Sequence, residues 1–582
     1  MPTPRSTAMT ITSRREFIIR IGSASAALAS GPLLSACGGG SDESDTLPVR
    51  FDYGVASGDP LADRVILWTH AKHGDFDAPS QAILLDWEVA EDAAFSQVVA
   101  RGQVTAEPAA GHTAKVDATG LRAGTDYYYR FVAGTSISPV GRTRTLPAAD
   151  VENVKLAVFS CANYPAGYFH VYTEAVRQGA QYAIHLGDYI YEYAADGYAS
   201  GDAQALGRVV QPTHEILTLD DYRRRYAQYR SDPDLKQLHA SMPMIAVWDD
   251  HEISNNTWRE GAENHTEGAE SRFVDRLAAA LQAYHEWLPI RTAASGDHKE
   301  IWRSFDFGNL LSLHMLDTRI AAREKQISLA ELASPQTATQ ALARLASPQR
   351  TLLGHVQQQW LAQQLAASQA RWQVLGQQVL MARMQVPVSI LRHLNPESLD
   401  PAALPAAMQA IEAYLRARAI AAQAPQMLTD EQRALLDPTT NPKLGYNLDA
   451  WDGYPAAREA VLQTAHQLGK PLLVLAGDTH NAWHSDLTLM DGTKVGEEFA
   501  TSSVSSPGFE EYLHMFAPAQ LQALFVDLID DLQYLNAHQR GLLLMDFTHR
   551  TATGHWIFVD TVKSRSYAAV RGHSAAFIEP AP

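Results

Sequence analysis

Short apolar runs that end in polar residues recur along the middle and C-terminal parts of the chain. Tyr182–Leu186 is such a run, and its length and the glycine that follows it, Gly187, are typical of a buried strand. Asp188 comes next, and Tyr191 lies three residues further on. A carboxylate can bridge two cations, and a tyrosine at this spacing can curl back as a phenolate, which suits a strongly acidic metal such as Fe(III). The stretch predicts a strand that ends in a metal-binding loop; the alternative is a turn before an aromatic edge strand.

Three further apolar runs also end in residues that can bind metals. Residues 155–160 lead to Cys161, residues 242–248 lead to Asp249, Asp250 and His251, and residues 471–476 lead to Asp478 and His480. In open α/β sheets, ligands bind at the carboxyl ends of the strands. Buried carboxylates repel one another and are costly without a compensating cation. The four runs together therefore predict a centre that holds more than one metal ion.

The same patterning divides the chain into an all-β segment and an α/β segment. Residues 50–146 contain short alternating strands separated by turn signals, which predict a β-sandwich similar to fibronectin-type-III-like modules. Residues 141–150 are the expected boundary. From 150 to 582, strands alternate with helices and the late strands look antiparallel, which predicts a two-sheet α/β sandwich. Residues 320–450, rich in Ala and Gln, are expected to form a mostly helical insertion.

The first 36 residues are predicted to be an export leader rather than part of the fold. Arg14 and Arg15 form a twin-arginine pattern, which implies the twin-arginine export machinery as a partner. The segment that ends at Cys37 resembles a bacterial lipobox, so Cys37 is the expected lipidation site and residues 37–49 the tether. The alternative is a simple cleaved leader with an incidental cysteine. We expect an exported protein, periplasmic or anchored to the membrane only through this lipid.

The charge and the cysteine count narrow the possible functions further. The formal net charge is −18, and it becomes −21 without residues 1–36, which carry four arginines and one glutamate. Such a chain is not expected to bind nucleic acid, except as a possible substrate, or to adhere to anionic lipid through its charge. Cys37 and Cys161 are the two cysteines. If Cys37 is lipidated, Cys161 is either a small buried hydrophobic residue or a metal-bound thiolate.

Several short motifs together resemble those of the PhoD-like alkaline phosphatase family. They are SCANY, GDYIYE, WDDHE with NN close behind, LDTR, LGQQV and GDTH, and they follow the family's order over residues 155–484. The resemblance extends to the metallophosphatase superfamily. It implies an αββα two-sheet sandwich preceded by a small all-β domain of the immunoglobulin or fibronectin-III-like kind. It also implies one Fe(III), calcium ions, and hydrolysis of phosphate monoesters and diesters.

The resemblance assigns metal ligands by motif position. It places Cys161, Asp188, Tyr191 and His480 around iron, and it places Asp250 and Asp478 on the calcium side, with Asp188 bridging to calcium. This division agrees with ligand chemistry, because calcium prefers hard carboxylate oxygens. Asp249 is the alternative to Asp250, since neighbouring residues on a strand point in opposite directions.

Three other residues have two interpretations each. Asn255, or its neighbour Asn256, would give calcium an amide oxygen or cap the loop. Arg319 would bind phosphate through its guanidinium or pair with Asp317. His251 would donate a proton or orient the phosphate, or it is an ordinary hydrogen-bonding residue beside the site. Gln377 and Gln378 are expected to support the ligands from outside.

The predicted reaction follows from the cations. A metal-activated hydroxide would attack phosphorus in line with the leaving alkoxide, with no Ser or Thr nucleophile. The chain is thus predicted to be an exported alkaline phosphatase, a phosphoric ester hydrolase. One alternative is a phospholipase-D-like phosphodiesterase on the same centre, and the other is a non-catalytic surface lipoprotein. The natural substrate and the number of calcium ions are left open by the sequence.

Overall fold

The computed structural model of the chain describes residues 48–77, 80–393, 403–513 and 516–578. The predicted leader, Cys37 and most of the predicted tether lie outside the described residues. Among the helices of the described segments, none combines the length and the apolar character needed to cross a membrane.

The first large sheet has nine strands, and its centre is parallel. The order is β25 (Ala569–Ile578), β24 (Thr551–Val559), β23 (Arg540–Thr548), β11 (Asn153–Phe159), β12 (Tyr182–His185), β13 (Met244–Ala246), β2 (Val55–Gly58), β3 (Arg64–His70) and β7 (Thr113–Thr119). Strands β11, β12 and β13 run parallel, with Phe159 beside His185 and His185 beside Ala246. Their carboxyl ends therefore lie at one edge of the sheet.

The second large sheet has seven strands and also carries a parallel centre. The order is β14 (Arg303–Phe307), β15 (Leu311–Met315), β16 (Trp372–Gly376), β19 (Leu472–Ala476), β21 (Lys494–Ala500), β20 (Ala482–Thr488) and β22 (Leu532–Asn536). The two sheets pack face to face. The indole N–H of Trp556 on β24 donates to the carbonyl of Ala500 on β21 at 2.9 Å, and the Trp556 ring stacks on Phe499.

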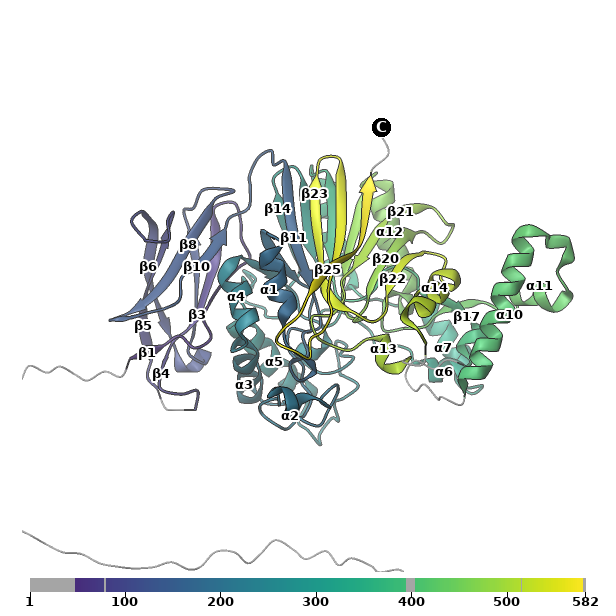
Figure 1. Cartoon of the computed structure of the whole chain (residues 1–582), viewed down its shortest axis with the longest axis horizontal. Helices are drawn as coiled ribbons and strands as arrows, with labels where there is room; N and C mark the ends of the chain where they lie inside the picture. Colours follow the sequence, from purple (N-terminus) through teal and green to yellow (C-terminus); the bar gives the residue numbers. More distant parts are fainter. Residues whose placement is uncertain (1–47, 78–79, 394–402, 514–515, 579–582) are drawn as a thin grey trace, which may run out of the picture. The chain divides into compact units, whose positions relative to one another are not determined.

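Alternation along β19 shows why helices cover the outer faces. Leu473 and Leu475 belong to the core between the sheets, whereas Leu472 and Val474 point to the other side. There they pack with residues of α8 (Gly354–Ala367) and α12 (Pro455–Gln467), and α14 (Pro518–Leu528) packs beside β22. Helices α1 (His170–Arg177), α3 (Leu219–Arg230), α4 (Pro233–Ser241) and α5 (Phe273–Trp287) accompany the nine-stranded sheet (Figure 1). The layers confirm the predicted αββα sandwich.

The N-terminal β region is joined to the α/β region through a shared sheet. Its other sheet contains β10 (Gly141–Arg144), β8 (Asp126–Ala133), β5 (Ile83–Ala90) and β6 (Val98–Ala106), with β9 (Ser136–Ile137) beside β8, and its residues pack on Val65 and Leu67 of β3. Strand β2 pairs in parallel with β13, through Gly58 and Met244. A Cβ atom at Gly58 would lie 2.5 Å from the Met244 carbonyl oxygen, so the close approach requires glycine there.

The helices of residues 320–450 fall on both sides of a central strand. Helices α6 (Leu329–Ala333), α7 (Ala338–Leu345) and α8 precede β16, whereas α9 (Val388–Leu391), α10 (Leu404–Gln423) and α11 (Asp430–Leu436) follow it. Strand β16 lies between β15 and β19 in the seven-stranded sheet. The stretch is therefore two helical segments separated by a core strand, and α10 and α11 extend away from the sheets (Figure 1).

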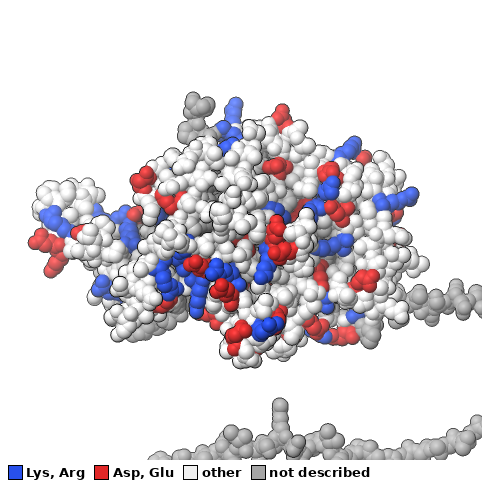
Figure 2. All heavy atoms as spheres, turned by 180° about the vertical axis from the view of Figure 1, so that it is seen from behind, with Lys and Arg blue, Asp and Glu red and all other residues white. Residues whose placement is uncertain are grey.

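Acidic and basic side chains are interspersed on the face of the molecule shown in Figure 2. No single-sign field dominates that view, although the chain as a whole carries a net charge of −18. On this face, charged side chains of the two signs therefore offset one another rather than form a broad patch of one sign.

Candidate active site

Strand ends from both sheets bring the predicted metal ligands together. Strands β11, β12 and β13 lead to the SCANY, GDYIYE and WDDHE motifs, and β19 leads to GDTH. The ligand atoms form three overlapping groups, each with all atoms within 4.8 Å of one another: Cys161, Asp188 and His480; Asp188, Asp250 and His251; and Asp249, Asp250 and Asp478. Asp188 and Asp250 each belong to two groups, so the groups form one continuous cluster.

The backbone turns sharply where these side chains leave the strands. Cys161, Asp188, Asp478 and His480 have positive φ angles of 61°, 55°, 64° and 63°. Residues with a Cβ atom rarely adopt this left-handed conformation, and such outliers concentrate at functional sites. Gly187 also has a positive φ, and a Cβ atom there would lie 2.4 Å from the backbone nitrogen of Asp249. Only glycine allows the ends of β12 and β13 to approach this closely.

Tyr191 curls back onto Asp188, as its spacing predicts. The hydroxyl of Tyr191 donates to Asp188 Oδ2 at 2.9 Å and lies 3.2 Å from Nε2 of His480. The hydroxyl of Ser506 in turn donates to the Tyr191 oxygen at 2.8 Å. Since the thiol of Cys161 belongs to the same group as Asp188 and His480, the predicted iron ligands converge from three strand ends.

Hydrogen bonding fixes the tautomer of His480. Its Nδ1–H donates to the carbonyl of Pro507 at 2.7 Å, which leaves the lone pair of Nε2 directed toward Tyr191. Burial lowers the pKa of His480 to about 3, so the imidazole is neutral at physiological pH. A neutral imidazole held through its other nitrogen is the form that binds metals.

Arg319 is surrounded by carboxylates in the structure. The guanidinium is fully buried and donates to Asp249, to Asp449 at 2.6 Å and to Asp478 at 3.0 Å, with Asp250 at 3.4 Å. These contacts differ from both sequence interpretations. A direct phosphate contact needs exposed donors, and the Asp317 carboxylate accepts the backbone N–H of Arg319 at 2.8 Å rather than the guanidinium. We therefore interpret Arg319 as the residue that holds the carboxylates in place.

The carboxylates that surround Arg319 differ in their pKa values. Burial raises the pKa of Asp249 to about 7, although Arg319 opposes the shift. Burial acts on Asp250 in the same direction, but Arg319 and His251 outweigh it and hold the pKa at about 2. Burial and the neighbouring Asp249 raise the pKa of Asp478 well above its usual range.

Buried oxygens without a hydrogen-bond partner show where a cation fits. Asp188 Oδ1, Asp249 Oδ2 and Asp250 Oδ1 are buried and accept no hydrogen bond among the described residues, although the Arg319 guanidinium lies 3.4 Å from Asp250 Oδ1. Such oxygens are costly unless a cation satisfies them. They belong to the cluster that also contains the imidazole of His480 and the thiol of Cys161, a donor set able to hold metal ions. The residues present therefore fit the predicted metal centre, with both Asp249 and Asp250 able to contribute.

His251 is held at the edge of the cluster by a buried glutamate. Its Nδ1 lies 2.7 Å from Glu192 Oε2, and its ring stacks on Tyr191 at a centroid distance of 4.3 Å. Burial lowers the pKa of His251, but Glu192 and Asp250 outweigh burial and raise it well above the usual range. The other oxygen of Glu192 accepts the backbone N–H of Asn255 at 2.7 Å. Glu192 thus orients the imidazole beside Asp188 and Asp250.

The two asparagines of the loop have different neighbours. Both amide groups donate to Glu263, but the backbone N–H of Asn256 also donates to Asp250 Oδ2 at 2.6 Å. Asn255 contacts Glu192 instead. The structure thus ties Asn256 to Asp250 through the backbone of Asn256. The hydrogen bonds to Glu263 use the amide nitrogens of both asparagines, so the amide oxygens are the atoms available to a cation.

Other supporting residues were not identified from the sequence. Glu252 accepts the backbone N–H groups of Asp188 at 2.9 Å and Asp249 at 2.7 Å, and also that of Tyr189. Glu192 and Glu252 are the last residues of the GDYIYE and WDDHE motifs, and this position is the feature of the sequence that could have indicated their supporting role. Asp449 and Ser506 come from distant segments and carry no local signal.

Gln378 supports the ligands from outside, as expected for this position. Its side-chain nitrogen donates to the carbonyls of Trp248 at 2.7 Å and Leu316 at 3.0 Å. Its oxygen accepts the N–H of Thr318 at 3.1 Å. The side chain thereby links the ends of strands from both sheets.

The fold and the cluster together define a class of protein: an αββα sandwich with a donor set for metal ions at its strand ends. The sequence model of the PhoD-like phosphatase family matches residues 156–556, and that of the family's N-terminal domain matches residues 38–147. Alkaline phosphatase D of Bacillus subtilis (strain 168) is 36% identical over 470 residues, which cover 79% of this chain and 70% of that protein. A solved structure described as "Structure of PhoD" superimposes with a TM-score of 0.71 at 30% identity and covers 92% of each chain.

The chain belongs to the PhoD-like phosphatase family. The resemblance predicted from the motifs is confirmed, and so is the enzyme class, a phosphoric ester hydrolase. The predicted β-rich region at residues 50–146 falls within the match to the family's N-terminal domain.

Proposed function

We propose that the protein is an exported, metal-dependent alkaline phosphatase that hydrolyses phosphate monoesters and diesters at the cluster around Asp188. The observation that supports this best is the convergence of Asp188, Tyr191 and His480, next to buried carboxylate oxygens without partners. A cluster of this kind is expected where cations bind a phosphoryl group.

We propose Fe(III) and calcium as the metals because the donor set divides by chemistry. Cys161, Tyr191 and His480 offer thiolate, phenolate and imidazole donors, which suit iron. Asp250 and Asp478 offer carboxylate oxygens, which suit calcium, and Asn255 would add an amide oxygen. Asp188 belongs to groups on both sides and would bridge them.

When bound, the metal ions would lower the pKa of a water molecule and neutralise charge on the phosphoryl oxygens. In the overall reaction the oxygen of water joins phosphorus, the ester P–O bond breaks, and the alcohol leaves with a proton. His251, oriented by Glu192 and placed beside Asp188 and Asp250, is the side chain proposed to donate that proton. Arg319 keeps Asp249 and Asp478 in position through its guanidinium and needs no contact with substrate.

The iron assignment predicts a colour that depends on Tyr191. Purified protein is expected to contain stoichiometric iron and to show a visible phenolate-to-iron charge-transfer band. Tyr191→Phe should remove this band while the protein stays folded, because only the hydroxyl is deleted. Tyr193→Phe is the matched control, since its ring stacks beside that of Tyr191 and the change likewise deletes only a hydroxyl. A colourless wild-type protein that contains only zinc would refute the assignment.

The calcium assignment predicts that activity depends on calcium in solution. Exhaustive chelation is expected to abolish hydrolysis of 4-nitrophenyl phosphate and of a 4-nitrophenyl diester, and added calcium should restore both. Magnesium should restore less, because it demands a stricter octahedral geometry. Full activity of protein shown by elemental analysis to lack calcium would contradict the proposal. The ratio of the two rates also separates a phosphatase from a phosphodiesterase.

Export and lipid attachment are proposed from the leader alone, which lies outside the described residues. Arg14 and Arg15 would direct the folded protein to the twin-arginine machinery, and Cys37 would carry the lipid. Cys37→Ala should release the protein from the membrane fraction without a change in activity, because Cys37 lies far in sequence from the cluster. A wild-type protein that is already soluble after cell breakage would exclude the lipid anchor.

A further inference from the structure

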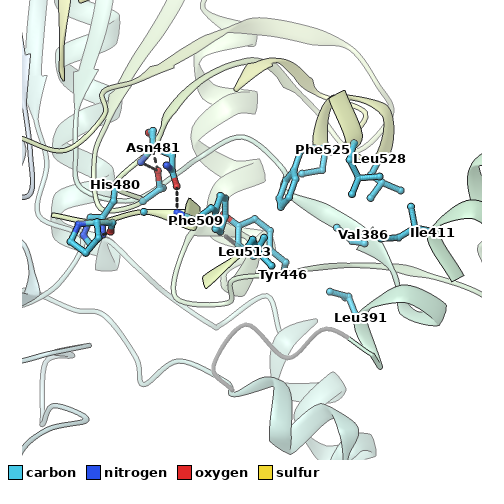
Figure 3. Close-up of a pocket in the computed structure, with 15 residues that line it drawn as sticks. Val386, Leu391, Ile411, Tyr446, His480, Asn481, Phe509, Leu513, Phe525 and Leu528 are labelled. Atoms are coloured by element: carbon cyan, nitrogen blue, oxygen red, sulfur yellow. Dashed lines mark hydrogen bonds between the residues drawn. The ribbon is translucent and has the colours of Figure 1, made fainter. Parts of the chain in front are cut away.

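An apolar pocket of about 280 Å³ opens beside the ligand cluster. Figure 3 shows His480 and Asn481 at one end and Ile411 and Leu528 at the other, with Phe509 and Phe525 between them. Most of its other lining side chains are aliphatic. The reaction described above has no role for a pocket of this composition.

His480 belongs both to the ligand cluster and to the residues that line the pocket. Its Nε2 lies 3.2 Å from the Tyr191 hydroxyl, at the end of the pocket that Figure 3 shows on the left. Its Nδ1 bonds to the carbonyl of Pro507, which also lines the pocket. A phosphoryl group held near Asp188 would therefore have the apolar pocket on its His480 side.

A polar cleft of about 800 Å³ opens beside Asp478 of the cluster. Asp478, Asp449, Asn256 and Lys325 are among the residues that line it. Tyr446 lines both the cleft and the pocket and stands between them. The cluster thus has a polar space on the Asp478 side and an apolar space on the His480 side.

The apolar walls are set by aromatic packing. The rings of Phe509 and Phe525 have a centroid distance of 5.2 Å, and Tyr446 packs against both. The backbone N–H of Phe509 donates to the side chain of Asn481 at 3.3 Å, which ties this wall to the loop of His480. Because the walls are packed on one another, an apolar group can enter without first ordering them.

We propose that this pocket binds the apolar alcohol of the substrate, so the enzyme prefers phosphate esters of alkyl or aryl alcohols over esters of polar alcohols. The proposal rests on the proposed hydrolysis at the cluster. A phosphate ester has its alcohol directly attached to phosphorus, and the pocket begins where the ligand cluster ends. A diester with one apolar and one polar alcohol would place the first in the pocket and the second in the cleft.

The test is a series of n-alkyl phosphates, from methyl to hexyl, at concentrations below those at which they aggregate, with glycerol phosphate as the polar comparison. Release of inorganic phosphate gives kcat/KM for each. We expect kcat/KM to rise by up to about fourfold for each methylene that enters the pocket. We also expect kcat/KM for glycerol phosphate to be lower than that for propyl phosphate. A comparison of kcat/KM for phenyl phosphate with kcat/KM for cyclohexyl phosphate then shows whether the pocket prefers aryl or alkyl alcohols.

A pocket variant separates binding in the pocket from other causes. Phe525→Ser, at a half-buried position on α14, should remove most of the gain from methyl to hexyl phosphate and leave methyl phosphate hydrolysis unchanged. Val526→Ser is the matched control, because Val526 is 36% exposed on the same helix and does not line the pocket. If Phe525→Ser fails to fold, Leu391→Ser at the far end serves in its place.

The outcomes distinguish this proposal from the proposed function. No hydrolysis of any ester by metal-loaded enzyme would overturn the function itself. Hydrolysis with kcat/KM independent of chain length would overturn only the pocket assignment. The same conclusion would follow if Phe525→Ser lowered kcat/KM equally for methyl and hexyl phosphate. A sedimenting dimer that Phe525→Ser dissociates, without any chain-length preference, would assign the pocket to a second copy of the chain and refute the proposal.

Discussion

Asp188→Asn is expected to lower kcat by about a thousandfold or more, because under the proposed function it removes the carboxylate charge common to two of the candidate metal groups, and with it several kcal/mol of cation binding. Among the described residues, Asp188 is the one carboxylate that shares a candidate metal group with Cys161 and His480 and another with Asp250. Its Oδ1 is buried without a partner, and its Oδ2 accepts the Tyr191 hydroxyl. Asparagine has the same shape but offers a neutral amide, so it cannot supply charge to two cations.

The measurement is kcat and KM for 4-nitrophenyl phosphate, together with bound metal by elemental analysis. Asp196→Asn is the matched control, since Asp196 is an exposed residue of the same loop and should leave both quantities unchanged. The thermal transition should fall little, because the backbone N–H of Asp188 still donates to Glu252. Wild-type activity and metal content in Asp188→Asn would exclude a bridging role for this residue.

Arg319→Met is expected to lower the free energy of unfolding by about 3–5 kcal/mol, because it leaves buried carboxylates without their cation. The guanidinium contacts Asp249, Asp449 and Asp478, and it is fully buried. A buried ion pair adds little compared with an apolar pair, but the removal of one partner leaves the other uncompensated. Methionine has a volume similar to that of arginine, so the loss of stability would come from the missing positive charge rather than from a cavity.

Added calcium is expected to restore part of the free energy of unfolding that Arg319→Met loses. A calcium ion held by Asp250 and Asp478 would offset the carboxylate charges that Arg319 otherwise neutralises. Arg208→Met is the matched control: Arg208 is a buried arginine paired with Asp232 at 2.7 Å, away from the cluster. It should lose comparable stability without rescue by calcium. Denaturant unfolding of both variants, with calcium and with chelator, gives the comparison. Equal effects of calcium on the two variants would show that Arg319 does not share its carboxylates with a cation.

The local pattern was sufficient for the strands that carry the site. The run at residues 155–160 predicts β11, observed as Asn153–Phe159, and the run at 471–476 predicts β19, observed as Leu472–Ala476. Both strands lie at the centre of a sheet and are buried on both faces, so a continuous apolar run is their sequence signature. The three-residue spacing of Asp188 and Tyr191 likewise predicts that Tyr191 curls back, and the structure places its hydroxyl on Asp188, because the contact is local.

Contacts between distant segments could not be predicted in the same way. The pairing of Gly58 with Met244, which merges the N-terminal strands with the α/β sheet, joins residues far apart in the sequence. The contact of Asp449 with Arg319 and that of Ser506 with Tyr191 are equally remote. A short pattern contains no information on such partners, because they meet only after the sheets and loops have packed.

The sequence by itself determined the two-sheet α/β class and the set of side chains at the strand ends, because strand periodicity and motif spacing are local properties. The family and its αββα architecture came from the resemblance of the motifs. The tertiary structure alone decided how those side chains are held. It turned Arg319 toward carboxylates, fixed the tautomer of His480 through Pro507, and placed an apolar pocket beside that histidine. Each of these depends on segments brought together by packing, and packing decides burial, hydrogen-bond partners and cavities.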